Sequence, residues 1–254
     1  MISVAVSGAG GRMGQMVAAA VADAPDLELS ACFDPGCVGS SVAGVTVSGE
    51  PSALAGSDIV IEFTTPDVVM QNLDVWREMG LHAVVGTSGF DGGRLAALRE
   101  QWGSGPPNCL VVPNFSIGAV LMMRFAEMAA PHFSASEVIE LHHDRKADAP
   151  SGTALATAAR MRAAGGPQNR SVESEEMVRG ARGADAAGVP VHAVRLPGLL
   201  AHQEVLLGSE GEVLMIRHDT TDRVAFMPGV LLAVRGVAGS AEPVTIGLEG
   251  LLGL

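Results

Sequence analysis

The chain of 254 residues contains no tyrosine, and phenylalanine and tryptophan together make up only 4% of it. Apolar residues nevertheless account for 48% of the sequence. A core of this protein must therefore be built mainly from valine, leucine, alanine and methionine. The length and the apolar content allow either one large domain or two domains of modest size.

Basic residues are also scarce, with 16 lysines and arginines against 28 acidic residues and a net charge of −12. Proteins that bind nucleic acid need a basic surface to neutralise phosphates. The charge balance therefore argues against a nucleic-acid partner. A small anionic ligand remains possible, because it needs only a local basic pocket.

Cysteines and long apolar runs are few. The three cysteines, Cys32, Cys37 and Cys109, follow no metal-ligand spacing. Their odd number, and a start that lacks the basic segment of a secretory signal, indicate reduced thiols in the cytoplasm. No apolar run reaches about 18 residues without charges or turn residues, so we expect no membrane span.

The first recognisable motif is a glycine-rich turn between an apolar run at 2–7 and a helix-forming segment at 15–22. Strand, glycine turn and helix form the context of a dinucleotide site. Gly8 would make the tight turn, Gly10 and Gly11 would let the backbone approach a pyrophosphate, and Gly14 would let the helix pack on the strand. The spacing departs from the usual G-x-G-x-x-G, and alone it would fit a surface turn.

Asp34 ends the next predicted strand, 27–33, and follows Gly14 by 20 residues. A carboxylate in this place can accept hydrogen bonds from an adenosine ribose. Proline and glycine follow it, not arginine, which disfavours a 2′-phosphate and favours NADH. Arg12 in the turn could still favour NADPH, so both cofactors remain open, with NADH slightly preferred.

Strands and helices then alternate up to about residue 112, with strands predicted at 58–63, 81–85 and 109–112 and helices at 66–79 and 91–102. This order predicts a parallel, doubly wound sheet, whose ligands bind at the carboxyl ends of the strands. Two segments at such ends should line the nicotinamide half of the site, although the first of them would also make an ordinary turn. They comprise Gly86, Thr87, Ser88, Val112, Pro113, Asn114 and Phe115.

The pattern changes after residue 115. A methionine-rich apolar helix is predicted at 117–130, followed by strands near 138–141 and at 191–196, 204–208 and 213–218. Short turns between the later strands indicate a mostly antiparallel sheet. We therefore expect an α/β chain with a Rossmann-type dinucleotide-binding domain at 1–115, joined by the C-terminal segment 226–254. An α+β domain at 116–225 should bind substrate and form the oligomer. The polar segment 168–188 is predicted to be a surface loop, to which we assign no role.

The densest group of polar residues lies between 140 and 154. His142 and His143 leave a predicted strand on opposite faces. Ser151 follows a proline and is a good N-cap for a helix at 152–164. No glutamate follows at the position that would close a capping box.

The start of that helix is a candidate anion site. The N–H groups of Gly152, Thr153 and Ala154 should be free, and together with the helix dipole they would attract a carboxylate. Lys146 and the two histidines would surround the same space. This predicts a cationic pocket for a small acid, with proton donors built in.

This stretch has two other interpretations. A pair of histidines at a strand end can be a simple polar exit from the strand, and Ser-Gly-Thr can be an ordinary helix start. Adjacent histidines can also bind a metal. However, Glu140 and Asp144 make no known ligand spacing with them, and no cysteine is near. We therefore predict no metal.

The glycine turn, taken with His-His-x-x-Lys-x-Asp-Ala-Pro-Ser-Gly-Thr at 142–153, resembles the 4-hydroxy-tetrahydrodipicolinate reductase family, formerly called dihydrodipicolinate reductase. The resemblance covers essentially the whole chain, and the 140–154 stretch is its specific part. It implies NAD(P)H-dependent reduction of 4-hydroxy-tetrahydrodipicolinate, with loss of water, on the diaminopimelate route to lysine. The chain departs from relatives that carry a basic residue directly after the acid of the second strand.

The resemblance also implies roles for individual residues. His142 would be the catalytic acid/base and Lys146 the proton donor. The carboxylates of a small dicarboxylate substrate would be held by His143, Gly152 and Thr153, with Ser151 grouped beside them. A homotetramer would form through the sheets of the second domain. The nicotinamide cofactor would be held by Gly8, Ala9, Gly10, Gly11, Arg12, Met13, Asp34 and the segments 86–88 and 112–115.

Two further classes of protein would share part of the pattern. A dehydrogenase acting on a semialdehyde would need a nucleophilic cysteine near the nicotinamide, and Cys109 lies inside a predicted strand. A cofactor sensor without catalysis would keep Asp34 and the glycine turn but would have no need of Lys146 beside His142.

Overall fold

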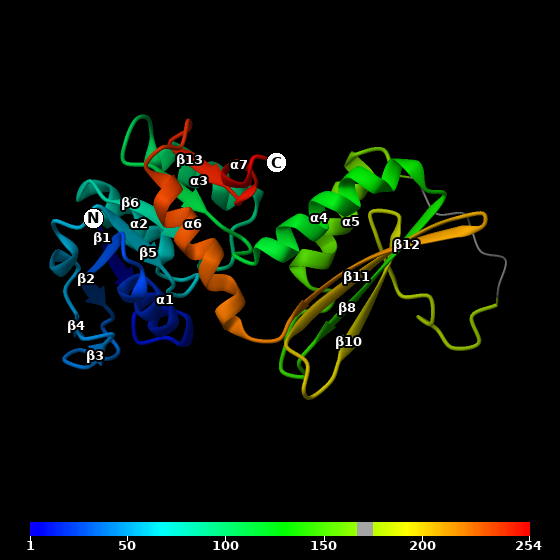
Figure 1. Cartoon of the computed structure of the whole chain (residues 1–254), viewed down its shortest axis with the longest axis horizontal. Coiled ribbons are helices and arrows are strands. Elements are labelled where there is room, and N and C mark those ends of the chain that lie inside the picture. Colours follow the sequence, from blue (N-terminus) through cyan, green and yellow to red (C-terminus); the bar gives the residue numbers. More distant parts are fainter. Residues whose placement is uncertain (167–174) are drawn as a thin grey trace. The chain divides into compact units, whose positions relative to one another are not determined.

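The computed structural model describes residues 1–166 and 175–254. The chain divides into two compact units (Figure 1). The first comprises Met1–Ile117 and Phe226–Leu254, and the second Gly118–Ala225. Residues 168–174 of the predicted surface loop lie outside the described residues.

The first unit is built on a sheet that, in the described part of the chain, has eight strands in the order β13-β7-β6-β5-β1-β2-β4-β3. The pairs from β13 through β4 are parallel, and β3 pairs antiparallel with β4. The doubly wound sheet expected from the sequence is therefore confirmed. Its strands are β1 (Ile2–Ser7), β2 (Leu27–Phe33), β3 (Ser41–Val42), β4 (Val45–Ser48), β5 (Ile59–Glu62), β6 (His82–Val85), β7 (Cys109–Val111) and β13 (Val244–Ile246).

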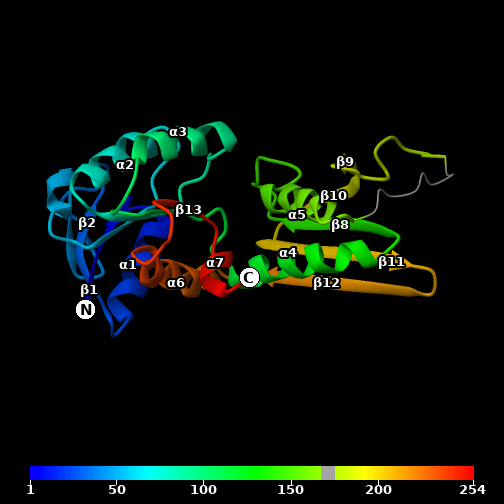
Figure 2. The same ribbon diagram turned by 90° about the horizontal axis from the view of Figure 1, so that it is seen from above.

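Helices cover both faces of this sheet, as Figure 2 shows. Successive side chains of a strand point to opposite faces, so Val4 and Val6 lie in one apolar cluster and Ala5 in another. The first cluster contains residues of α1 (Arg12–Asp23) and α6 (Met227–Val237). The second contains residues of α2 (Val69–Glu78) and α3 (Gly92–Trp102), including Trp76 and Trp102.

The strand order changes direction at β1. The chain runs from β1 to β2 on one side, and returns to β5, β6 and β7 on the other. Ligands of open parallel sheets bind at such a switch point, beyond the carboxyl ends of the strands. The ends of β1, β2, β5 and β6 therefore define where a cofactor belongs.

The C-terminal segment completes the first unit. β13 extends the sheet by pairing parallel with β7, and α7 (Glu249–Leu252) follows. A 3-10 turn at Arg223–Phe226 precedes α6, which begins at Met227 with Pro228 in its first turn. Proline suits that position because the N–H it lacks would have no partner there.

The second unit contains a sheet in which the described strands follow the order β12-β11-β8-β10-β9. The β8–β10 pair is parallel and the other pairs are antiparallel. This confirms the mostly antiparallel sheet, but a strand at 184–186 lies where the sequence predicted only loop. The strands are β8 (Ala135–His142), β9 (Ala184–Ala186), β10 (Val189–Arg195), β11 (Ala201–Ser209) and β12 (Glu212–Thr220).

Two helices of the second unit, α4 (Ile117–Ala129) and α5 (Gly152–Ala163), pack against the same face of this sheet. α4 is followed by a 3-10 turn at Ala130–His132. Val138 of β8 and Val205 of β11 lie opposite each other under these helices and are fully buried. No helix in the described residues of the chain is both long and apolar enough to pass through a membrane.

Candidate active site

The helix-covered face of the second sheet changes from apolar to polar near the end of β8. Val138, Val205 and Ile216 lie in register across three strands. Two residues along, the same row reads Glu140, Gln203 and His218. Residues directly opposite each other share a face of the sheet. This polar row therefore lies on the side of the sheet that α4 and α5 cover.

Glu140 stands at one end of this polar row and is completely buried. Its Oε1 accepts hydrogen bonds from the Ser151 backbone N–H at 3.0 Å and from Arg195 Nη2 at 2.8 Å. Its Oε2 accepts from Arg195 Nη1 at 2.8 Å and lies 2.5 Å from His142 Nδ1. Burial opposes ionisation, but the hydrogen bonds from Arg195 and His142 outweigh it and hold the pKa of Glu140 below its usual value.

His142 is the last residue of β8, and its side chain is 14% exposed. Burial lowers the pKa of its imidazole, and the charges of Lys146 and Arg195 act in the same direction. The hydrogen bond to Glu140 opposes these effects without cancelling them. The ionised carboxylate can only accept, so Nδ1 carries the proton in that bond and Nε2 is left for a ligand.

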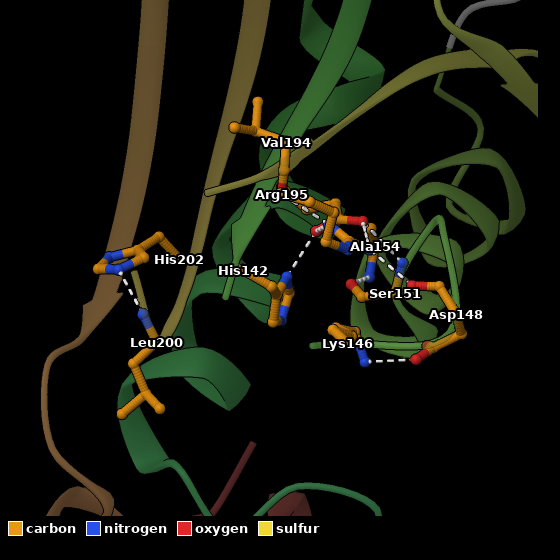
Figure 3. Close-up of polar contacts among 10 residues, drawn as sticks. His142, Lys146, Asp148, Ser151, Ala154, Val194, Arg195, Leu200 and His202 are labelled. Carbon is orange, nitrogen blue, oxygen red and sulfur yellow. Dashed lines mark hydrogen bonds and ion pairs between the residues drawn. The ribbon is translucent and has the colours of Figure 1, made fainter. Parts of the chain in front are cut away.

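Lys146 lies in the loop that follows β8, close enough to act on the charge of His142. Its ammonium pairs with Asp148 at 2.8 Å, and its backbone N–H donates to the carbonyl of His143. Figure 3 shows Lys146 between His142 and Asp148 in that view. Arg195 also donates to the carbonyl of Asp148 at 2.6 Å, so the loop is tied to β10.

The predicted helix start is confirmed, with one correction. α5 begins at Gly152, and the Ser151 hydroxyl accepts the N–H of Ala154 at 3.2 Å. We expected that N–H to be free, but the cap residue itself uses it. In the described part of the chain, the N–H groups of Gly152 and Thr153 have no partner, so two donors remain for an anion.

His143 also has an unused polar atom. Its Nδ1 is buried and has no hydrogen-bond partner among the described residues. A buried polar atom without a partner carries a free-energy cost that a ligand can remove. His143 therefore remains a candidate ligand-binding residue in the loop that follows β8.

The glycine turn of the first unit has the shape that a dinucleotide requires. Gly8 has φ +77°, and a Cβ on it would lie 2.3 Å from the carbonyl oxygen of Phe63. A Cβ on Gly14 would lie 2.1 Å from the Gly8 carbonyl oxygen. The N–H groups of Arg12 and Met13 at the start of α1 have no partner among the described residues. The turn can therefore accept a pyrophosphate at the helix start.

Asp34 lies beyond the carboxyl end of β2 and is fixed by the same turn. Its Oδ2 accepts the N–H of Gly10 at 3.0 Å, and its Oδ1 accepts the N–H of Gly36 at 2.8 Å. Each oxygen keeps a further lone pair for a ribose hydroxyl. The structure gives Arg12, which is exposed, no ion pair within the described residues.

The ends of β5 and β6 are tied together by the predicted residue Thr87 and by Glu62 and Thr64, which were not among the predicted site residues. Glu62 is fully buried and accepts hydrogen bonds from Trp76 at 2.8 Å, Asn72 at 3.0 Å and the Thr64 hydroxyl. The Thr87 hydroxyl accepts the Thr64 N–H at 3.0 Å. A signal was present, because Glu62 ends a strand that otherwise reads as continuously apolar.

The remaining predicted cofactor residues are packed closely. A Cβ on Gly86 would meet the rings of Phe63 at 2.2 Å and Phe115 at 2.8 Å, so any other residue at this position would require these rings to move. Val112 and Phe115 are buried, and Asn114 caps the following turn by accepting the Ser116 N–H at 2.9 Å. Ser88 and Pro113 are exposed.

Histidine, cysteine and acidic residues are the candidate ligands for a metal site, and Cys109 is the candidate for a nucleophilic cysteine. The described residues contain no group of three histidine, cysteine or acidic side chains arranged to hold a metal. Cys109 is completely buried in β7, and burial raises the pKa of its thiol far above the usual value. A nucleophilic thiolate at this position, which a semialdehyde dehydrogenase would need, is therefore disfavoured.

The structure thus groups the predicted residues in two places. His142, Lys146 and the N–H groups of Gly152 and Thr153 gather at one end of the second sheet, and His143 follows His142 in the chain. The turn at 8–13, Asp34 and the ends of β6 and β7 gather at the carboxyl edge of the first sheet. Glu140 and Arg195, which organise the former group, were not among the predicted site residues.

Comparison with known proteins gives matches to both units. Residues 2–115 match the family model "Dihydrodipicolinate reductase, N-terminus", and residues 118–252 match "Dihydrodipicolinate reductase, C-terminus". The chain is 51% identical over 258 residues to 4-hydroxy-tetrahydrodipicolinate reductase of Cutibacterium acnes, with 100% of both chains covered. It is also 51% identical over 260 residues to the enzyme of that name from Thermobifida fusca, again with full coverage.

Solved structures agree with these matches. Dipicolinate-bound dihydrodipicolinate reductase from Paenisporosarcina sp. TG-14 superposes with a TM-score of 0.85 at 37% identity, covering 98% of this chain and 99% of that one. A probable dehydrogenase from Thermotoga maritima gives a TM-score of 0.62 at 11% identity, covering 99% and 93%. The second likeness extends only to the fold.

Proposed function

Because the chain belongs to the dihydrodipicolinate reductase family, we propose that the group around His142 and the start of α5 is its substrate site. The protein is an NAD(P)H-dependent 4-hydroxy-tetrahydrodipicolinate reductase of the diaminopimelate route to lysine. The reaction consumes the substrate, the reduced nicotinamide and one proton, and yields tetrahydrodipicolinate, the oxidised nicotinamide and water. The protein must therefore bind two carboxylates, deliver a proton and hold the cofactor.

The substrate carboxylates are bound by hydrogen-bond donors that have no partner within the described residues. The N–H groups of Gly152 and Thr153, at the positive end of the α5 dipole, suit one carboxylate. The unpartnered Nδ1 of His143 supplies a further donor. Ser151 contributes indirectly, because its hydroxyl caps the helix and its N–H binds Glu140. The relative from Paenisporosarcina binds dipicolinate, a dicarboxylate, which supports this class of ligand.

Protons are supplied by His142 and Lys146. The Glu140 carboxylate occupies Nδ1 of His142, so proton transfer to and from the substrate uses Nε2. Lys146 gives a second proton donor, its ammonium group, in the same region, and Asp148 orients it at 2.8 Å. As water leaves, His142 as acid/base takes a proton from the substrate ring and returns one to the departing hydroxyl, so this step consumes no proton. Lys146 then supplies the one proton that the reaction consumes, to the carbon next to the one that receives the hydride.

The first unit holds the cofactor. When bound, the reduced nicotinamide supplies the hydride that the substrate receives. The turn at 8–13 binds the pyrophosphate at the start of α1, and Asp34 binds the adenosine ribose. Residues 86–88 and 112–115 form the nicotinamide half of the site at the ends of β6 and β7. NADH is favoured, because the carboxylate of Asp34 would repel a 2′-phosphate, and Arg12 lowers that preference.

The assembly we propose is a homotetramer, formed through the sheet of the second unit. β12 is an edge strand, and its residues Val213 and Met215 are 71% and 55% exposed. Exposed apolar residues on an unpaired strand edge are typical of a surface that another subunit covers. We place the protein in the cytoplasm, since its three cysteines are free thiols and its relatives are biosynthetic enzymes.

One observation carries the proposed site: the Glu140-bound His142 stands near Lys146 at the end of the strand that leads to the free N–H groups of α5. The test is a steady-state assay of the purified protein with the aldol product of pyruvate and aspartate semialdehyde, run separately with NADH and with NADPH. We expect oxidation of either cofactor that depends on the aldol product, with the higher kcat/KM for NADH. Cofactor oxidation that does not depend on the aldol product would contradict the assignment.

A further inference from the structure

Glu140 is a buried carboxylate, so loss of any of its hydrogen bonds would carry a high free-energy cost. Its two carboxylate oxygens accept four hydrogen bonds, from His142, from both Nη atoms of Arg195 and from the backbone of Ser151. Each oxygen accepts two of them. Such a carboxylate is fixed in position, and only the ionised form can accept two hydrogen bonds at each oxygen.

The contacts of Glu140 connect three parts of the proposed site. His142 lies two residues along the same strand, Arg195 lies in the neighbouring strand β10, and Ser151 caps α5. Arg195 pairs in register with His142 in the β8–β10 ladder. The buried charge of Glu140 therefore fixes three groups: the imidazole of His142, the guanidinium of Arg195 and the start of α5.

We propose that Glu140 is the positioning residue that fixes the Nδ1–H tautomer of His142 and directs Nε2 to the substrate. Arg195 and the Ser151 N–H hold Glu140 in place for that purpose. The inference rests on the proposed role of His142 as the acid/base. It assigns to Glu140 no contact with substrate or cofactor.

The charges that face His142 set the sign of the expected effects. Among the described residues, Glu140 on the same strand is the negative group in contact with it, at 2.5 Å. Lys146 of the following loop and Arg195 of β10 are positive, and Asp148 neutralises part of the charge of Lys146. β11 presents Ala201 opposite His142, which adds no charge. Loss of the Glu140 charge would leave two cations acting on the imidazole, which disfavours the protonated ring.

The informative variant is Glu140→Gln, which keeps the shape and removes the charge. In either orientation of the amide, the NH₂ group faces donors: Arg195 with the Ser151 N–H, or Arg195 with His142. The amide therefore cannot satisfy all four hydrogen bonds. Rotation of the amide NH₂ towards His142 would also convert Nδ1 into an acceptor and move the ring proton to Nε2.

The chain supplies a matched control on the same strand. Glu137 also accepts from a histidine and an arginine, His192 at 2.8 Å and Arg182 at 2.6 Å, but it is partly exposed and points to the other face of the sheet. Glu137→Gln removes the same charge three residues away. It should leave both His142 and the pH profile of kcat unchanged.

The test uses the full-length protein labelled with ¹⁵N-histidine, with the His142 ring assigned by its loss in His142→Gln. In the free protein we expect the neutral ring to carry its proton on Nδ1. In Glu140→Gln we expect the ring pKa to fall by about one unit or more and the Nδ1–H tautomer to lose its dominance. The alkaline limb of kcat should move to lower pH by a similar amount, with little change in the KM for cofactor.

Other results would overturn the proposal. An unchanged tautomer and pKa in Glu140→Gln, with the variant folded by its melting temperature, would show that Glu140 does not fix the ring. A loss of stability without any shift of the pH profile would reduce Glu140 to a structural residue. Full kcat in His142→Gln would instead refute the acid/base role in the proposed function. The ring titration of the free protein separates that failure from a failure of Glu140.

Discussion

The Oδ2 atom of Asp34 accepts the backbone N–H of Gly10 at 3.0 Å. The residue that would bind the ribose is thereby fixed to the turn that would bind the pyrophosphate. Replacing Asp34 by serine removes the negative charge and leaves a small hydrogen-bonding group. We expect the ratio of kcat/KM for NADPH to that for NADH to rise about tenfold, because the repulsion of a 2′-phosphate is lost. Parallel kinetics with both cofactors measure this ratio, and a ratio unchanged from the parent would remove Asp34 from cofactor selection.

Lys146→Ala tests the second proton donor. The ammonium pairs with Asp148 and lies near His142, and its removal should lower kcat about 10²-fold or more. The cofactor is expected to bind as before, because the first unit is unchanged. Arg145→Ala is the matched control, since Arg145 is an exposed cation one residue earlier and should be silent. If Lys146→Ala altered only cofactor affinity, the role of proton donor would be wrong.

Gly14→Ala tests the packing of α1 against the glycine turn. The added Cβ would lie 2.1 Å from the carbonyl oxygen of Gly8, and backbone cannot move aside cheaply. We expect a destabilisation of about 1–3 kcal/mol, as for an overpacked core, with weaker cofactor binding. Gly92→Ala is the control, because nothing lies within 4 Å of its Cβ at the start of α3. Thermal unfolding of both variants should separate them, and equal melting temperatures would contradict the packing argument.

His82 makes the stability of the first unit depend on pH. Its Nδ1 accepts the N–H of Asn108 at 2.9 Å, and burial lowers the pKa of the imidazole. A lowered pKa means that the stabilisation is complete above the unfolded value of about 6.5 and is lost as the pH falls through the folded value. We expect the melting temperature to fall below about pH 6.5, and less steeply in His82→Gln. Scanning calorimetry between pH 5 and 8 measures the slopes, and parallel curves would exclude His82 as the cause.

Met215→Lys tests the proposed tetramer. Met215 is 55% exposed on β12, and a lysine there would place a charge in the proposed subunit contact. We expect the mass in solution to fall below that of the parent tetramer while the fold is kept. Met128→Lys is the control, because Met128 on α4 is similarly exposed, at 58%, and lies outside the strand edge. Light scattering coupled to size exclusion reports the mass, and an unchanged tetramer in Met215→Lys would place the interface elsewhere.

Local patterns predicted much of this fold because local physics decides it. The run at 2–7, the glycine turn and the helix after it follow from apolar spacing and from backbone freedom at glycine. The cap at Ser151 follows from its own hydroxyl. These features involve residues that are neighbours along the chain, and so they can be predicted from one sequence.

Longer-range contacts could not be predicted in this way. Glu140 was considered only as a metal ligand, because the sequence does not show that β8 and β10 pair and bring Arg195, 55 residues away, to its carboxylate. The strand at 184–186 has no apolar run of its own and forms by pairing with β10. Both features depend on strand register, which arises only when distant segments meet.

The last strand of the first sheet, β13, is also the last to be made. Because the first unit needs Phe226–Leu254 for its edge strand and for α6, it cannot be completed until that segment has been synthesised. The second unit is continuous in sequence and can fold while the chain is still being synthesised. The first unit, whose synthesis begins first, is therefore completed after the second. A chain truncated near residue 225 would bury the core of the second unit and leave the core of the first unit open.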